Sequence, residues 1–232
     1  MGQPGADEEL VLDPIALPPN KSPMERVSAM NKPKIAVIGS GQVAQILSKG
    51  FLKHGYPVRL GNRTPEKLQT FAADNGLEVS TPAIAAVAAD VVVLAVKGTA
   101  AEIVIRELAA SLAGKVVIDT TNPIADVPPV DGVLTYFTSA SESLMERLQA
   151  IAPSARFVKA FNSVGGPFMV DPAFPGAKPT MFIAGNDPEA KLAVGSILAG
   201  FGWEFEDMGK AASARPIEAL CQLWCARGFN GG

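Results

Sequence analysis

The sequence is poor in the residues that most often carry catalytic or metal chemistry, since its 232 residues include one histidine and two cysteines. A Ser-His-Asp triad, a histidine zinc site or a histidine proton shuttle would each have to be built around His54. That residue follows a predicted helix, which argues for a charge at a helix terminus instead. We therefore expect neither a catalytic side chain nor a metal site.

Long apolar runs and clusters of one charge are also missing. No uninterrupted apolar stretch approaches the roughly 18 residues that a transmembrane helix needs. The net charge is −3 without a run of lysine or arginine, so the sequence lacks the basic surface of a nucleic-acid-binding protein. We expect no nucleic-acid partner, no membrane partner and a cytoplasmic location.

The two cysteines lie four residues apart in a predicted helix. Cys221 and Cys225 then share one helix face, a spacing that favours packed thiols over a structural disulfide. The 48% apolar content is enough to bury one large core, or one core with a smaller annex.

The most informative stretch is residues 34–44, an apolar strand pattern that runs into Gly-x-Gly-x-x-Ala and then into a helix. Gly39 permits a tight turn, Gly41 allows the backbone to approach a pyrophosphate, and Ala44 lets the helix pack closely on the strand. The pattern is typical of a dinucleotide-binding turn at a helix N-terminus. An α/β crossover with a glycine turn and no ligand is the alternative.

From this turn onward, strand-like and helix-like segments alternate as in a doubly wound parallel sheet. Further strands are predicted at 57–60, 77–79, 90–96, 115–119, 156–160, 180–184 and 204–208. Helices are predicted at 65–74, before 88, and at 100–112, 141–152, 188–198 and from about 215. The fold class is α/β, a Rossmann-type doubly wound sheet with a small C-terminal α/β unit.

The expected organisation has three parts. Residues 1–31 are rich in Gly, Pro and acidic residues without apolar periodicity, and we expect a flexible leader, native or added. Residues 32–155 form the nucleotide-binding Rossmann domain, and residues 156–232 form a smaller acceptor-binding unit.

The segment after the second predicted strand indicates which nucleotide binds. Where NAD-binding proteins carry an acidic residue for the ribose hydroxyl, this chain has Asn62, Arg63, Thr64 and, in the next turn, Lys67. Arg63 can pair with a 2′-phosphate, and Lys67 adds a second positive charge. NADP is therefore favoured, and a solvated helix start is the alternative.

The ends of the fourth and fifth predicted strands supply the nicotinamide side, because ligands of open α/β sheets lie beyond the carboxyl ends of the strands. Ala95, Val96 and Lys97 end the fourth strand, and Asn122 follows the fifth. Asn122 could orient a carboxamide or a ribose. Lys97 could contact a phosphate or the substrate, or be a solvated strand-end lysine.

Several motifs occur together in order: Gly-Ser-Gly-Gln-Val-Ala, Gly-Asn-Arg-Thr-Pro-Glu-Lys, Asp-Thr-Thr-Asn-Pro, Val-Lys-Ala-Phe-Asn and Ala-Arg-Pro-Ile-Glu-Ala-Leu. With this order, residues 34–230 resemble the NADP-dependent coenzyme F420 (deazaflavin) oxidoreductase family and its Rossmann relatives. Membrane ferric reductases carry a similar soluble domain. The resemblance implies NADP phosphate contacts at Ser40, Gln42 and Val43, and 2′-phosphate contacts at Asn62, Arg63 and Lys67.

The resemblance also implies a deazaflavin-facing loop at Asn162, Ser163, Val164, Gly165 and Gly166, although family members often have His-Thr in place of Asn162-Ser163. A hinge between domains is the alternative for this loop. In such enzymes a hydride passes directly between nicotinamide and deazaflavin, and two copies pair. Arg215 could hold an anionic group of the acceptor or pair with Glu218.

The function predicted on this basis is an NADP(H)-dependent oxidoreductase that transfers a hydride between nicotinamide and a deazaflavin (coenzyme F420) or flavin. One alternative is a small-molecule imine or keto reductase, although the region after Asn162 is short and strand-rich for the helical domain of those enzymes. The other is a non-catalytic NADP-sensing protein.

Overall fold

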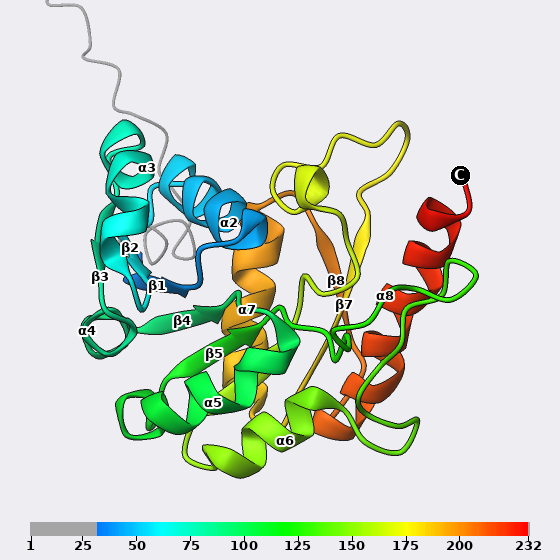
Figure 1. Ribbon diagram of the computed structural model, residues 1–232. Coiled ribbons are helices and arrows are strands. Elements are labelled where there is room, and N and C mark those ends of the chain that lie inside the picture. Colours follow the sequence, from blue (N-terminus) through cyan, green and yellow to red (C-terminus); the bar gives the residue numbers. More distant parts are fainter. Residues whose placement is uncertain (1–31, 232) are drawn as a thin grey trace, which may run out of the picture. The chain divides into compact units, whose positions relative to one another are not determined.

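The computed structural model describes residues 32–231, so the predicted leader, residues 1–31, and Gly232 lie outside the described residues. Residues 33–231 are built on one eight-stranded sheet, in the order β3-β2-β1-β4-β5-β6-β7-β8 (Figure 1). Neighbouring strands run parallel except for β6 and β7, which are antiparallel. The strands are β1 (Ile35–Ile38), β2 (Val58–Gly61), β3 (Glu78–Ser80), β4 (Val91–Leu94), β5 (Val116–Asp119), β6 (Arg156–Lys159), β7 (Thr180–Gly185) and β8 (Glu204–Asp207).

The central strands owe their position to continuous apolar runs, as expected for strands buried on both faces. All four residues of β1, β4 and β5 are buried. In the register of the sheet, Val37 of β1 lies between Leu60 of β2 and Val93 of β4. The observed sheet confirms the predicted α/β Rossmann-type class.

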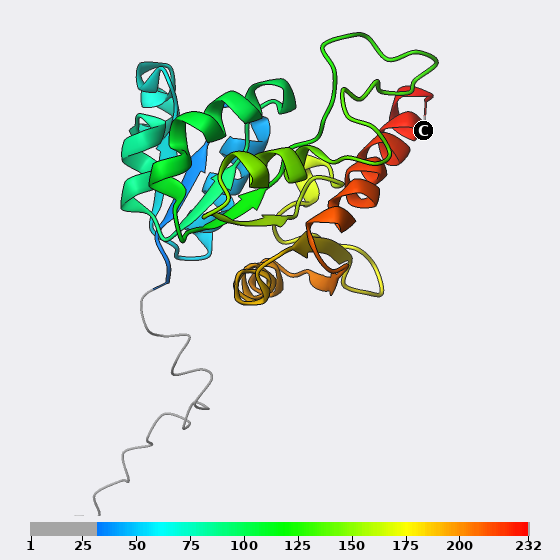
Figure 2. The same cartoon turned by 90° about the horizontal axis from the view of Figure 1, so that it is seen from below.

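Helices cover both faces of this sheet (Figures 1 and 2). One face carries α2 (Gln42–Lys53), α3 (Gln69–Asp74) and α7 (Pro188–Gly200), which share a core with β1 and β4. The other face carries α4 (Pro82–Ala88), α5 (Gly98–Leu108) and α6 (Leu144–Ile151). Two apolar layers therefore hold the strand ends, and the loops that leave them, in fixed positions.

The last helix, α8 (Ala214–Phe229), packs beside the long segment 120–143. The Tyr136 hydroxyl donates to the carbonyl oxygen of Glu218 over 2.7 Å, and Gln222 Nε2 donates to that of Leu134 over 2.6 Å. Both views show the green segment running along the red helix (Figures 1 and 2). Segment 120–143 follows β5, so α8 is tied to the chain that leaves the carboxyl end of the sheet.

Two predicted helices differ in detail from the observed ones. The segment 65–74 begins with a 3₁₀ turn, Pro65–Leu68, before α3, and the predicted helix 100–112 ends in a 3₁₀ turn, Ala109–Leu112, after α5. In both cases the terminal turn tightens, as helix ends commonly do. The predicted boundary at 155/156 falls between α6 and β6, and β6 pairs with both β5 and β7.

Candidate functional site

The turn between β1 and α2 has the geometry that a dinucleotide phosphate requires. Gly39 has φ +143°, and a Cβ there would collide with the carbonyl oxygen of Ala95. A Cβ on Gly41 would meet nothing within 4 Å, so the chain is open to approach at that position. The N-terminus of α2 has no side-chain cap and no acidic residue in its first turn. Its N–H groups and positive dipole therefore suit an anion.

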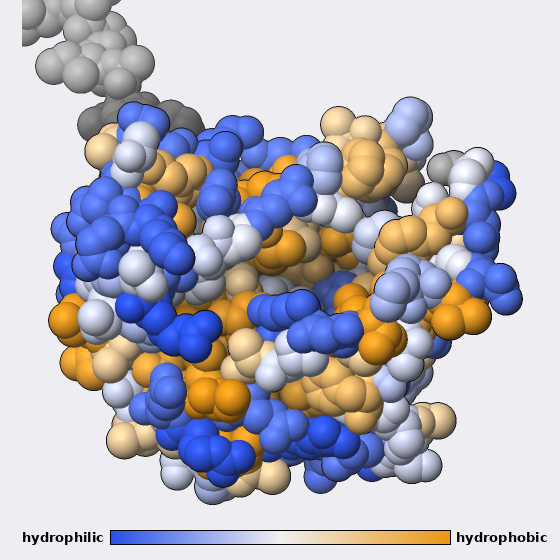
Figure 3. Space-filling view, viewed as in Figure 1, coloured by the Kyte–Doolittle hydropathy of each residue, from blue (hydrophilic) through white to orange (hydrophobic). Residues whose placement is uncertain are grey.

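A crevice of about 300 Å³ opens at the carboxyl ends of β1, β2 and β4. It brings together eight of the predicted nucleotide-binding residues: Gly39, Ser40, Gly41, Asn62, Arg63, Ala95, Val96 and Lys97. The predicted residues Gln42, Val43, Thr64, Lys67 and Asn122 are not part of its lining. In Figure 3 the surface is hollowed between α2 and the segment 161–178.

Arg63, which follows β2, places a positive charge at one end of the crevice. Asn62 Oδ1 accepts the Thr64 N–H over 2.8 Å and so shapes the turn that presents Arg63. Arg63 is exposed, and among residues 32–231 no carboxylate lies within ion-pair distance of its guanidinium. Lys97, across the crevice, is paired instead with Asp126 over 2.5 Å. Arg63 is thus the better placed of the two to bind a phosphate.

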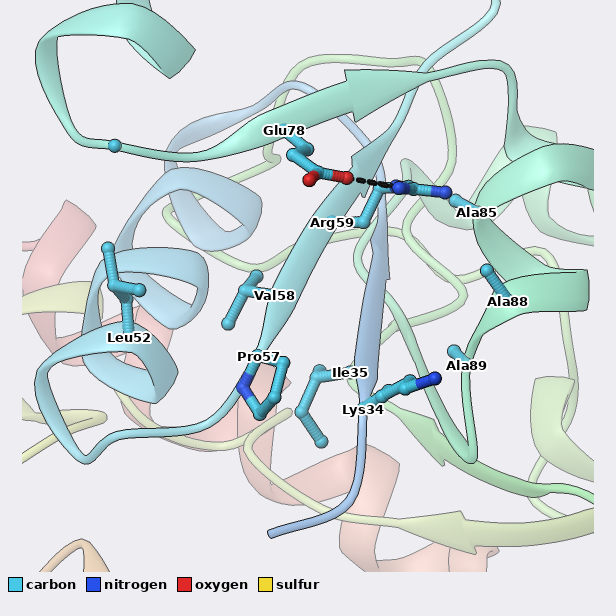
Figure 4. A pocket seen from close by; sticks show the side chains of 11 residues that line it. Lys34, Ile35, Leu52, Pro57, Val58, Arg59, Glu78, Ala85, Ala88 and Ala89 are labelled. Carbon is cyan, nitrogen blue, oxygen red and sulfur yellow. Dashed lines mark hydrogen bonds and ion pairs between the residues drawn. The ribbon is translucent and has the colours of Figure 1, made fainter. Parts of the chain in front are cut away.

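A second cavity, of about 380 Å³, lies at the opposite end of the strands (Figure 4). Its lining includes Lys34 and Ile35 at the start of β1 and Pro57 and Val58 at the start of β2. Arg59 points into this region and is paired with Glu78, as the dashed line in Figure 4 marks. Since nucleotides bind at the carboxyl ends of such sheets, this cavity is not the candidate site.

Asn122 and Asn162 are bonded to each other at the carboxyl ends of β5 and β6. Asn122 Nδ2 donates to the carbonyl oxygen of Asn162 over 2.7 Å, and Asn162 Nδ2 donates to Asn122 Oδ1 over 3.0 Å. The sequence predicted one residue at the nicotinamide side and the other in the acceptor loop, and the structure joins them. Both side chains hold backbone in place.

The predicted acceptor loop, residues 162–166, packs toward the phosphate turn. A Cβ on Gly166 would lie 2.6 Å from Ile46 Cδ1 on α2, so a side chain there would require Ile46 to move, whereas Gly165 has open space around it. Val164 packs against the core cluster beneath α2, and Ser163 is half-buried. The loop therefore lies beside α2, close to the turn at Gly39–Gly41.

The chain also contains a buried ionic cluster that the sequence analysis missed. Lys159 Nζ lies 2.7 Å from Asp119 Oδ2 and 2.8 Å from Glu218 Oε1, and it donates to the carbonyl oxygen of Thr121 over 2.8 Å. Burial alone would lower the pKa of Lys159, but the charges of Asp119 and Glu218 outweigh it and the pKa is raised. Lys159 lies next to the last residue of the predicted strand 156–160, where a lysine gives no sign of burial.

Of the two alternatives for Arg215, the pairing with Glu218 does not occur in the structure. Arg215 binds Glu146 through two bonds of 2.6 and 2.9 Å, because Glu218 is turned inward to Lys159. The bonds from Arg215, together with those from Ser143, lower the pKa of Glu146 to about 2. The guanidinium group of Arg215, at the start of α8, is therefore already bound to a carboxylate of the same chain.

The histidine and the cysteines lie apart from the crevice residues described above. His54 Nε2 lies 2.8 Å from Asp171 Oδ1, just after α2. The Sγ atoms of Cys221 and Cys225 are 3.9 Å apart in α8, and both thiols are free. Burial is the main cause that raises the pKa of Cys221 to about 12, which keeps that thiol protonated.

The strand order β3-β2-β1-β4-β5-β6 with a glycine turn after β1 defines a Rossmann-type dinucleotide-binding protein. Residues 34–123 match the sequence model of the family "NADP oxidoreductase coenzyme F420-dependent". Residues 34–123 are thus similar to this family of NADP-dependent oxidoreductases.

Known structures and curated proteins agree with that family. A crystal structure from Arthrobacter sp. FB24, described as a candidate F420-dependent NADP reductase, is 29% identical, with a TM-score of 0.78 over 83% of this chain and 92% of that one. The rat metalloreductase STEAP3 is 28% identical over 188 residues, which are 81% of this chain and 36% of that protein. This chain thus spans about a third of the length of that curated relative.

Solved structures of lower sequence identity share the fold alone. An imine reductase from Pseudomonas sp. is 18% identical with a TM-score of 0.64, and the match covers 86% of this chain and 63% of that one. Within residues 32–231, no helix combines the length and the apolar character needed to cross a membrane.

Proposed function

We propose that this chain binds NADP(H) in the crevice at the carboxyl ends of β1, β2 and β4 and transfers a hydride between its nicotinamide and a deazaflavin or flavin. The observation that carries the proposal is that one crevice combines an uncapped helix N-terminus after Gly41 with Arg63, for which residues 32–231 offer no ion-pair partner. The first suits a pyrophosphate and the second suits a 2′-phosphate.

We propose contacts along the whole coenzyme. Ser40, Gln42 and Val43 would hold the pyrophosphate at the start of α2, and Asn62, Arg63, Thr64 and Lys67 would surround the 2′-phosphate. Ala95, Val96, Lys97 and Asn122 would form the wall toward the nicotinamide. When bound, the coenzyme supplies the hydride, and the chain's own residues position it and exclude water.

The loop at residues 162–166 is the proposed acceptor side. It follows β6, is bonded to Asn122 through Asn162, and reaches α2 at Gly166, so we propose that it forms the border between α2 and the nicotinamide side. A ring that lies in this border could stack on the nicotinamide, and direct hydride transfer needs no side chain as acid or base. That requirement agrees with the burial of Lys159 and the remote contacts of His54.

Absorbance measurements test the reaction. Mixing the protein with NADPH and either coenzyme F420 or FMN should oxidise NADPH, and mixing it with reduced F420 and NADP should run the reverse reaction. Turnover only with imines or ketones would favour a small-molecule reductase. Binding of NADPH without oxidation in the presence of any of these acceptors would favour a sensor.

A charge reversal tests the coenzyme assignment. Arg63→Asp should raise the Kd for NADPH by about 10- to 100-fold, the loss expected for one or two charge-assisted hydrogen bonds, and change the Kd for NADH far less. Arg59→Gln is the matched control, because Arg59 lies on the same strand but is paired with Glu78 at the other cavity. A parallel loss of NADH affinity in Arg63→Asp would disprove the 2′-phosphate contact.

A further inference from the structure

We propose that the buried cluster of Lys159, Asp119 and Glu218 is the positioning device for the nicotinamide side of the crevice. The inference rests on the proposed function, since it concerns how the same crevice is shaped. Lys159 and Asp119 are 0% exposed and Glu218 is 2% exposed, so none of the three can touch a ligand. Their effect on a bound coenzyme must pass through the backbone that they hold.

The cluster holds the loop that leaves β5 at one residue, Thr121, through three of its polar groups. Asp119 Oδ1 accepts the Thr121 N–H over 2.9 Å and its hydroxyl over 2.6 Å. The ammonium group of Lys159, which can only donate, donates to the Thr121 carbonyl oxygen over 2.8 Å. The buried cluster therefore holds Thr121 through its N–H group, its side chain and its carbonyl group.

The next residue carries that constraint to the crevice wall. A Cβ on Gly98 would collide with the Asn122 carbonyl oxygen, so the Asn122 backbone lies directly against the start of α5. Gly98 follows Ala95, Val96 and Lys97, which line the crevice. A displacement of Thr121 would thus move Asn122 against the wall beneath which the nicotinamide is proposed to lie.

The same cluster ties the acceptor loop and α8 to this point. Asn162, 3% exposed, donates through Nδ2 to Asn122 Oδ1 and, over 2.9 Å, to the carbonyl oxygen of Ile217. Glu218 follows Ile217 and accepts the N–H groups of Leu144 and Met145 over 2.9 and 3.1 Å. Three segments, from β5, β6 and α8, therefore meet above one ammonium group.

Stability alone does not account for such a cluster. Apolar residues of similar volume often replace a buried ion pair without loss of stability, while the ionic version fixes one arrangement of its partners more narrowly. Here the partners held in one arrangement are the loops on both sides of the proposed hydride-transfer site.

The test compares two ligands and two matched glutamates. NADPH contains the nicotinamide, and 2′,5′-ADP carries the 2′-phosphate without it, so the ratio of their Kd values isolates the nicotinamide side. Glu218→Gln should raise the Kd for NADPH about three- to tenfold, the effect of about one hydrogen bond, and change that for 2′,5′-ADP by less than about twofold.

Glu146→Gln is the control, because Glu146 also binds an N-terminal N–H of α6 and a cation but has no bond to Lys159 or Thr121. It should lower the melting temperature and leave both Kd values unchanged. Asp119→Asn is measured alongside as a second cluster variant, in case Glu218→Gln does not fold. It leaves the Lys159 ammonium group with one carboxylate, that of Glu218, and keeps an Oδ1 atom that can bind Thr121. The Kd for NADPH should again rise while that for 2′,5′-ADP stays nearly unchanged.

Three results would overturn the inference. Unchanged NADPH binding in both cluster variants would show that the cluster positions nothing, and an equal loss in Glu146→Gln would show a general effect of stability. A wild-type protein without affinity for 2′,5′-ADP would instead refute the proposed function, and the inference with it.

Discussion

At the residue scale, the two glycines of the turn after β1 serve different needs. Gly39 adopts a positive φ and lies against the backbone of Ala95, so its lack of a side chain is required by the fold itself. Gly41 has an ordinary φ of −72° and open space around it, so the fold tolerates a side chain there. A glycine is needed at position 41 only if a ligand must approach the backbone there.

Alanine substitutions separate the two roles. Gly39→Ala should lower the free energy of unfolding by at least about 2 kcal/mol, through strain and collision, as seen in a lower melting temperature. Gly41→Ala should cost less than about 1 kcal/mol but weaken NADPH binding, because the methyl group would occupy the approach to the pyrophosphate. Undiminished NADPH affinity in Gly41→Ala would contradict the proposed phosphate site.

Residue by residue, the sequence predicted what local spacing controls. Gly39, Gly41 and Arg63 follow from their distance to a strand, and they meet in one crevice. Lys159 and Glu218 are 59 residues apart in sequence and pair only because β6 and α8 pack together, so no local pattern could reveal them. For the same reason, neither alternative offered for Arg215 included its actual partner, Glu146.

At the element scale, the N-terminus of α6 is held by side chains from two directions. Ser143 and Glu146 form a reciprocal capping box, and Arg215 binds the carboxylate of Glu146 from α8. The sequence predicted the strands and a helix at 141–152, where α6 is found. The contact between α6 and α8 was not predictable, since it depends on how distant elements pack.

The low pKa of Glu146 makes this contact dependent on pH. The folded-state pKa of about 2 lies below the ordinary 4.5, so its stabilising contribution is complete above pH 4.5 and is lost as the pH falls toward 2. The shift corresponds to about 3 kcal/mol before allowance for the partial exposure of Glu146, which lowers the actual contribution. Melting temperatures of the wild type and Glu146→Gln should differ at pH 6 and converge near pH 2. A gap that stays constant over this range would contradict the assignment.

At the scale of the whole molecule, the eight strands form one sheet, and charged groups cross the predicted domain boundary. Lys159 on β6 is bonded to Asp119 on β5 and to Glu218 on α8, so residues before and after 156 share a buried cluster. The division into 32–155 and 156–232 stays a proposal about function, with nucleotide on one side and acceptor on the other.

The shared sheet predicts how the described part of the chain unfolds. Calorimetry should show one cooperative transition for residues 33–231, because separating the two proposed domains would expose the edge of β5 and leave buried charges unpaired. Lys159→Met should lower the free energy of unfolding by about 3–5 kcal/mol and keep a single transition. Two resolved transitions in the wild type would show that the parts fold independently.

The position of Glu218 in the last described helix has a consequence for biosynthesis. As the chain leaves the ribosome, Asp119 and Lys159 emerge well before the second carboxylate of their cluster. Until α8 has been synthesised, the ammonium group lacks one of its two counter-charges and favours contact with water. The interior between β5 and β6 therefore closes late, and a nascent chain halted before α8 should remain sensitive to proteases around Thr121.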